Sequence, residues 1–325
     1  MPTIPYTAQN FNSHWGALLK GYHPLSVTWE ELVWSAITVG KPGIAELFSH
    51  GWYSLSDVIV RSHMIYANLR QTLSRFEKST LYDSLDPTEK GATSYFVGMM
   101  AAKLVAARLL NTPWLFHLSR FKQDGGMLTL KGNSQPDLIG LNGRRDWIII
   151  EAKGRTNGFS SDALLKAKAQ TRKLRQINGQ CPALRVGIQA YFSPCLELML
   201  DDPEPEEFDD DAVDVVAEQA DLLRGYYSFA HSVTRGSNDV RTVLGRQYAF
   251  YRVEDVGLTI GLDRSIQSSF DDSSICDIVG ELRTADEPAV LKDGAFTTFP
   301  DGIAIQLDGR WTKNLMLRQP GMRNG

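Results

Sequence analysis

Hydrophobic residues in the first quarter of the chain recur at the three- and four-residue spacing of helices. This spacing covers residues 14–78, and the sequences that begin at Thr28 and Ser54 have the composition of helix N-terminal caps. We therefore expect residues 1–85 to form a helical N-terminal region. No catalytic motif is visible within it.

A stronger helix signal follows at Asp86. Asp86 can cap the helix, Pro87 suits its first position, and Glu89 can close a capping box. The following residues are rich in Ala, Gly and Met, which suits close packing against a sheet. A metal-binding role for Glu89 is possible in principle, but its place in the cap explains it without one.

After this helix the spacing of hydrophobic residues changes to one that is typical of strands. Three short segments are rich in strand-forming residues: MLTLKG (127–132), PDLIGLN (136–142) and DWIIIEAKG (146–154). A helix is expected from Ser160 to a stop at Asn178–Gly179, followed by a buried strand at Leu184–Phe192. The order helix, three strands, helix, strand predicts an α/β core over residues 86–200, with a mixed sheet and a helix on each face.

The remainder of the chain divides into two parts. Residues 201–221 are acidic and contain no Lys or Arg. They read as a solvated linker, or alternatively as a segment that competes with a polyanion for a basic groove. Residues 222–325 show weaker alternation, which predicts an α+β accessory region.

Composition argues against disulfide-rich, zinc-binding, secreted and membrane-spanning proteins. The formal net charge is −4, but it becomes positive once the acidic segment is set aside. Three widely spaced Cys residues and six His residues form neither a disulfide framework nor a zinc pattern. The N-terminus shows no secretory signal, and the longest nearly uncharged stretch is too short to span a bilayer. We expect a soluble cytoplasmic protein without a membrane partner.

The third of these segments, DWIIIEAKG, ends in charge, which is costly in a buried strand unless a function requires it. If the two strands before and after NGRR pair as a hairpin centred near Arg144, Asp137 lies opposite Glu151. A two-residue Asn-Gly turn would shift this register. In either case side-chain alternation places Lys153 on the same face as Glu151, so two carboxylates and an ammonium gather at one end of the sheet.

This charge cluster predicts a metal site. Two adjacent carboxylates repel each other, and a divalent cation removes that conflict. Oxygen ligands favour a hard ion such as Mg²⁺, with Mn²⁺ as a substitute. A bound metal would activate water and neutralise a phosphoryl oxygen, while Lys153 could position the water or stabilise developing charge. These groups suit phosphodiester hydrolysis.

The helix after the strand supports the same chemistry. We expect Ala163, Ala167, Leu174 and Ile177 to form its inward stripe, with Gln170 on that stripe and facing the carboxylates. Basic residues that could bind phosphates, or simply form a solvated helix face, are Arg155, Lys166, Lys168, Arg172, Lys173 and Arg175.

A second Pro-Asp pair, Pro300-Asp301, precedes Asp308-Gly-Arg310 in a similar arrangement. The pattern alone is therefore weak. Three isoleucines that lead into Glu151 and the basic helix that follows favour the first copy.

Pro136-Asp137 followed by Glu151-Ala152-Lys153 resembles the motif of the PD-(D/E)XK nuclease superfamily, which has the restriction-endonuclease-like fold. The resemblance covers about residues 86–193. It implies that Asp137, Glu151 and the Ala152 carbonyl bind the metal and that Lys153 assists the nucleophilic water. Gln170 is similar to a glutamine found in some branches, although the tyrosine that often follows there is replaced by Leu174.

The resemblance implies a Mg²⁺-dependent nuclease that acts on nucleic acid, most readily DNA, as in restriction or phage-defence endonucleases. Many such enzymes cut duplexes as dimers. Two other hypotheses remain open: a non-catalytic nucleic-acid-binding module that kept the fold, and a subunit of a larger complex in which the flanking regions carry the function.

Overall fold

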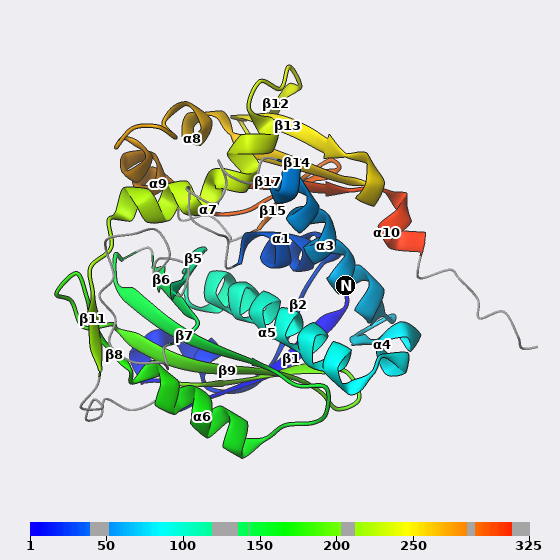
Figure 1. The fold of residues 1–325 in the computed structure, drawn as a ribbon, viewed down its shortest axis with the longest axis vertical. Coiled ribbons are helices and arrows are strands. Elements are labelled where there is room, and N and C mark those ends of the chain that lie inside the picture. Colours follow the sequence, from blue (N-terminus) through cyan, green and yellow to red (C-terminus); the bar gives the residue numbers. More distant parts are fainter. Residues whose placement is uncertain (40–51, 119–135, 143, 203–211, 285–289, 314–325) are drawn as a thin grey trace, which may run out of the picture.

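The computed structural model describes residues 1–39, 52–118, 136–142, 144–202, 212–284 and 290–313 (Figure 1). Within these residues seven strands form a mixed central sheet. In sheet order they are β2 (Gly21–Ser26), β1 (Thr3–Gln9), β10 (Leu196–Asp201), β9 (Leu184–Phe192), β7 (Trp147–Gly154), β6 (Leu138–Leu141) and β5 (Trp114–His117). The expectation of an α/β fold with a mixed sheet is confirmed.

The strand β7 lies near the middle of this sheet. It pairs in parallel with β9 and in antiparallel fashion with β6. Helix α5 (Pro87–Leu109) covers one face of β7, and helix α6 (Ser161–Thr171) covers the other (Figure 1). Because both faces are covered, the strand can be apolar almost throughout, and Trp147 to Ala152 are all buried.

The expected order of helix, three strands, helix and strand is present, with one change. The first of the three strands is β5, which the sequence analysis did not predict. The segment predicted in its place, residues 127–132, lies outside the described residues. The β5 strand pairs with β6 from Trp114↔Leu141 to His117↔Leu138.

The helix after β7 is shorter than expected. It ends at Thr171 instead of Asn178, and Leu174–Ile177 forms a strand, β8, that pairs with β11 (Val213–Val215). Leu174 and Ile177 are buried there. They therefore belong to the strand and not to the helix. Of the predicted inward stripe, only Ala163 and Ala167 lie on α6, where Ala167 is buried and Ala163 is half-buried.

The N-terminal region is not purely helical, which corrects the prediction for residues 1–85. Its first two strands, β1 and β2, complete the central sheet, and β1 pairs in parallel with β10. Helix α1 (Trp29–Thr38) begins at Thr28 with the expected capping box, whereas Ser54 lies inside α3 (Trp52–Asn68). The region also contains η1 (Ser13–Trp15), η2 (Ala17–Leu19), β3 (Leu69–Gln71), β4 (Phe76–Lys78) and α4 (Thr80–Ser84).

The last third of the chain combines helices with a second sheet of six strands among the described residues. Helix α7 (Gln219–Thr234) lies between this sheet and the central one (Figure 1). The strands in sheet order are β12 (Val240–Val243), β13 (Arg246–Val253), β14 (Leu258–Asp263), β17 (Ile303–Leu307), β16 (Phe296–Thr298) and β15 (Leu291–Asp293). The remaining elements are η4 (Glu254–Val256), α8 (Arg264–Ser268), α9 (Ile275–Thr284) and α10 (Gly309–Lys313). None of the described helices combines the length and apolar character needed to cross a membrane.

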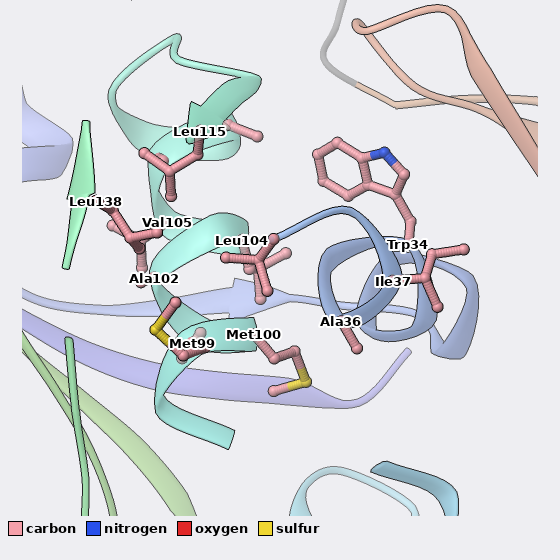
Figure 2. Packing of buried hydrophobic residues seen from close by; sticks show 14 of the residues in the cluster. Trp34, Ala36, Ile37, Met99, Met100, Ala102, Leu104, Val105, Leu115 and Leu138 are labelled. Atoms are coloured by element: carbon pink, nitrogen blue, oxygen red, sulfur yellow. The ribbon is translucent and has the colours of Figure 1, made fainter. Parts of the chain in front are cut away.

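Helix α5 connects the two halves of the core. It starts with the predicted capping box of Asp86 and Glu89, and residues 97–107 are buried without interruption. Figure 2 shows its apolar side chains in contact with neighbours on both sides. On one side are the sheet residues Leu115 and Leu138, and on the other are Trp34, Ala36 and Ile37 of α1.

A buried polar network joins α5 to the C-terminal region and explains the second Pro-Asp pair. Lys103 is fully buried and donates to the Pro113 carbonyl and to the Tyr226 hydroxyl. Tyr226 in turn donates to Asp301 at 2.5 Å, and Trp34 Nε1 donates to the same carboxylate oxygen at 2.8 Å. The Ile303 N–H donates to the other carboxylate oxygen, so both oxygens of Asp301 have protein donors and the residue has a structural role.

Helix α5 and strand β7 approach each other closely at two glycines, Gly98 and Gly154. A Cβ atom on Gly98 would lie 2.7 Å from the Gly154 nitrogen, and one on Gly154 would lie 1.6 Å from the Ser94 carbonyl oxygen. Both distances are too short for side chains, so the two main chains can approach only because Cβ atoms are absent.

We predict opposite effects of two Gly-to-Ala substitutions in α5. Gly98→Ala should lower the free energy of unfolding by about 1–3 kcal/mol, because the new methyl group meets β7 backbone. Gly91→Ala, where a Cβ meets nothing within 4 Å, should raise it by about 0.5–1 kcal/mol. Urea denaturation of both variants measures these changes, and equal effects would contradict the packing argument.

Candidate active site

The register of the β6–β7 hairpin is the one that places Asp137 next to Glu151. Leu138 pairs with Ile150 and Leu141 with Trp147, which confirms the hairpin centred near Arg144. The buried Asn142 fixes this turn, because its Oδ1 accepts the N–H groups of Arg144 at 2.9 Å and of Asp146 at 2.8 Å. An Asx-type turn replaces the two-residue alternative.

Each of the two carboxylates accepts a hydrogen bond from a main-chain N–H group on the neighbouring segment. The Asp137 N–H donates to Glu151 Oε2 at 2.8 Å, and the Ala152 N–H donates to Asp137 Oδ2 at 3.1 Å. Each carboxylate is therefore held by the strand that carries the other. Pairing of β6 with β7 fixes the two N–H donors, and each donor then orients the side-chain carboxylate that accepts from it.

Lys153 and Gln170 complete the cluster. Lys153 Nζ donates to Glu151 Oε1 at 2.5 Å and to Gln170 Oε1 at 2.6 Å. Gln170 reaches this position from α6, but its hydrogen-bond partner is the Lys153 ammonium and not a carboxylate as expected. Asp137, Glu151, Lys153 and Gln170 thus lie together, although they come from the residue before β6, from β7 and from α6.

Burial dominates the electrostatics of Glu151. The residue is 0% exposed. Burial and then the charge of Asp137 raise the pKa of Glu151 to about 7, against the opposing effect of Lys153. A partly protonated carboxyl at neutral pH is the expected result of two acids in one buried place. A divalent cation would favour its charged form.

The donor set fits a hard divalent cation. Among the described residues no three side chains of His, Cys, Asp or Glu converge, so a metal here would have two carboxylates and several waters, as Mg²⁺ prefers. Asp137 Oδ1 accepts no hydrogen bond from the described residues. The Ala152 N–H points toward Asp137, and its carbonyl points the same way, because N–H and C=O of one strand residue share a side.

The predicted phosphate-binding residues do not form one continuous surface. Lys166 is exposed and Arg155 is half-buried. Lys168 is instead turned toward the buried Asp201, with Nζ 3.0 Å from its Oδ2. Arg172 and Lys173 are half-buried between α6 and β8. Lys168 therefore has a structural partner, which leaves Lys166 and Arg155 as the better candidates for contact with a polyanion.

The acidic segment has structured ends. Residues 203–211 lie outside the described part of the chain. At one end Asp201 belongs to β10, and at the other Asp214 belongs to β11 and forms two hydrogen bonds with Arg175, at 2.9 and 2.7 Å. The boundaries 201 and 221 therefore include strand residues as well as linker.

Sequence reasoning missed Gln189 on β9. It is fully buried, and it pairs opposite Lys153 in the parallel register. Its side-chain amide accepts the N–H of Ser160 and donates to the carbonyl of Ser160, both at 2.8 Å. Ser160 caps α6, so Gln189 fixes the start of the helix that carries Gln170. A lone polar residue inside the apolar strand LRVGIQAYF was the available signal.

No family model, no curated protein and no solved structure matches this chain.

The raised pKa of Glu151 predicts a pH-dependent stability in metal-free buffer. Between about pH 4.5 and 7 the folded protein retains a proton that the unfolded chain releases, so stability falls as pH rises through this window. We expect Glu151→Gln to reduce this decline by about 1–3 kcal/mol. Urea denaturation in EDTA at several pH values tests it. Substitution of the exposed Asp162 by Asn should leave the decline unchanged.

Proposed function

We propose that this protein is a Mg²⁺-dependent nuclease that hydrolyses phosphodiester bonds of DNA. The observation that carries the proposal is the arrangement of Asp137 and Glu151 on adjacent strands, with Lys153 in contact with Glu151 and with Gln170. Two carboxylates, one ammonium and one amide at the end of a sheet are a reasonable set for metal-assisted hydrolysis. Neutral acceptors could satisfy the Asp137 and Ala152 N–H groups that these carboxylates bind, without the cost of placing two acids side by side.

The residues of the cluster have different roles in this reaction. Asp137, Glu151 and the Ala152 carbonyl are the groups that would hold the metal, which when bound supplies Lewis acidity and a water of lowered pKa. Lys153 Nζ lies beside the Glu151 carboxylate, where it can orient the attacking water and stabilise negative charge that develops on the phosphate. Gln170 holds that ammonium in place from the opposite side.

The fold supports the resemblance to the PD-(D/E)XK superfamily as part of this proposal. Helix α5, strands β5, β6 and β7, helix α6 and strand β9 occur along the chain in the order that the resemblance implies, with the short strand β8 inserted between α6 and β9. The carboxylates lie where β6 begins and β7 ends, and the two helices cover opposite faces. Additional strands, β1, β2 and β10, extend the sheet on the β9 side.

DNA is the proposed substrate because of the groups around the site. Arg155 directly follows the catalytic strand, and Lys166 is exposed on the helix that carries Gln170. Cations next to a metal site give a polyanion salt-dependent affinity.

Cleavage of supercoiled plasmid tests the proposal. We expect nicking or linearisation by the wild type in Mg²⁺ or Mn²⁺ but not in EDTA, and a loss of about 100-fold or more in Lys153→Ala. Lys20→Ala, in which an exposed Lys far from the site is removed, should cut as the wild type does. Absence of metal-dependent cleavage of DNA or RNA by the wild type would overturn the proposal, as would full activity of Lys153→Ala.

A further inference from the structure

The loop between β7 and α6, residues 155–160, is held to the fold at its start. The Arg155 N–H donates to the Ala190 carbonyl at 2.9 Å, which continues the pairing of β7 with β9. Arg155 Nε then donates to the Gly158 carbonyl at 3.1 Å, across the loop itself. These bonds fix the chain direction immediately after Lys153.

Two further anchors hold the rest of the loop. Thr156 Oγ1 lies 2.9 Å from Ser94 Oγ and accepts from the Tyr82 hydroxyl at 3.3 Å. At the other end, Gln189 holds both main-chain groups of Ser160. A connection that is held at every second or third residue presents its remaining side chains in fixed positions.

Phe159 is the side chain that this loop presents. Its neighbour Ser160 is fixed by Gln189, and the ring contacts Tyr191 edge to face, with 5.8 Å between ring centroids. Phe159 is nevertheless 44% exposed, whereas Tyr191 beneath it is only 8% exposed. The aromatic ring is therefore supported from one side by the protein and open to solvent on the other.

The exposed ring lies on the same face of the sheet as the candidate catalytic groups. Glu151 pairs with Gly187 and Lys153 with Gln189, and Tyr191 is the next residue of β9 on that face. Tyr191 lies four residues beyond Gly187, which corresponds to about 13 Å along the strand. Glu151 itself is buried, whereas 28% of the Lys153 side chain is exposed. A strand of nucleic acid that contacts Lys153 could therefore extend past the half-buried Arg155 to the exposed Phe159.

We propose that Phe159 is a stacking platform for an unpaired base, so that the substrate is single-stranded or has a single-stranded segment beside the cleaved bond. This inference rests on the proposed nuclease function and names its substrate class. A fixed, half-open aromatic ring binds the face of a base, and bases within a duplex have both faces covered by their neighbours. Arg155, in the same loop, supplies a cation for the adjacent phosphate.

Substitution of Phe159 by Leu tests the platform, because leucine can still cover Tyr191 but cannot stack on a base. Binding is measured in EDTA with a single-stranded oligonucleotide that contains 2-aminopurine and with the matching duplex. We expect the wild type to quench the fluorescence of the single strand and to bind it more tightly than the duplex. Phe159→Leu should lose the quenching and about 10-fold in affinity for the single strand, with duplex affinity unchanged.

Two further variants complete the design. Phe159→Tyr should retain both quenching and affinity, because its ring can stack. Leu165→Ala removes another exposed apolar side chain, 62% exposed on α6, and should leave single-strand binding unchanged. If Phe159→Leu binds the single strand as the wild type does, or loses duplex affinity equally, the ring is only a cover for Tyr191 and the inference is wrong.

The experiment separates this inference from the proposed function. Quenching and Phe159-dependent binding without Mg²⁺-dependent cleavage would support the platform and overturn the nuclease. Cleavage of plasmid that depends on Lys153, together with an unquenched single strand, would overturn the platform and leave the nuclease supported.

Discussion

The contact between α5 and β7 at Gly98 and Gly154 is the constraint on which the rest of the candidate site depends. It brings a buried helix against the end of the strand that carries Glu151 and Lys153. Side chains on the α5 face of this end must be small, so Ala152 and Gly154 occupy it. The larger and charged groups are consequently on the opposite face, under α6.

The positions of the other groups of the site depend on the elements that pack beside and over that face. Pairing with β6 brings Asp137 to Glu151, and pairing with β9 brings Gln189 beside Lys153. Gln189 holds the start of α6, and α6 packs over Gly187, where Leu164 and Ala167 fill the space that a side chain would occupy. Gln170 then reaches Lys153 from the end of the helix. Strand pairing therefore fixes the positions of Asp137, Glu151 and Lys153, and the buried Gln189 amide fixes the start of the helix that carries Gln170.

The sequence predicted the site better than it predicted the surroundings. The sequence placed the charged groups at one end of the sheet but left two hairpin registers open, because β7 is apolar on both faces and a shift would not expose it. The structure has the register centred near Arg144. The end of α6 could not be predicted from periodicity, since the three-residue spacing of Leu174 and Ile177 is helical and a regular strand would place them on opposite faces. In the structure the pairing of β8 with β11 shifts register after Leu174, and both residues are buried. β5 was missed because WLFH is too short for a periodic signal. Gln189 was missed because its importance depends on Ser160, which lies 29 residues earlier in the chain.

The central claim is that Asp137 and Glu151 together bind a divalent cation, and calorimetric titration of EDTA-treated protein with Mg²⁺ or Mn²⁺ tests it most directly. The account predicts saturable binding by the wild type, with affinity at least 10-fold weaker in Asp137→Asn and in Glu151→Gln. Asp162→Asn should bind as the wild type does. Absence of binding by the wild type, or equal affinity in all four proteins, would contradict the account.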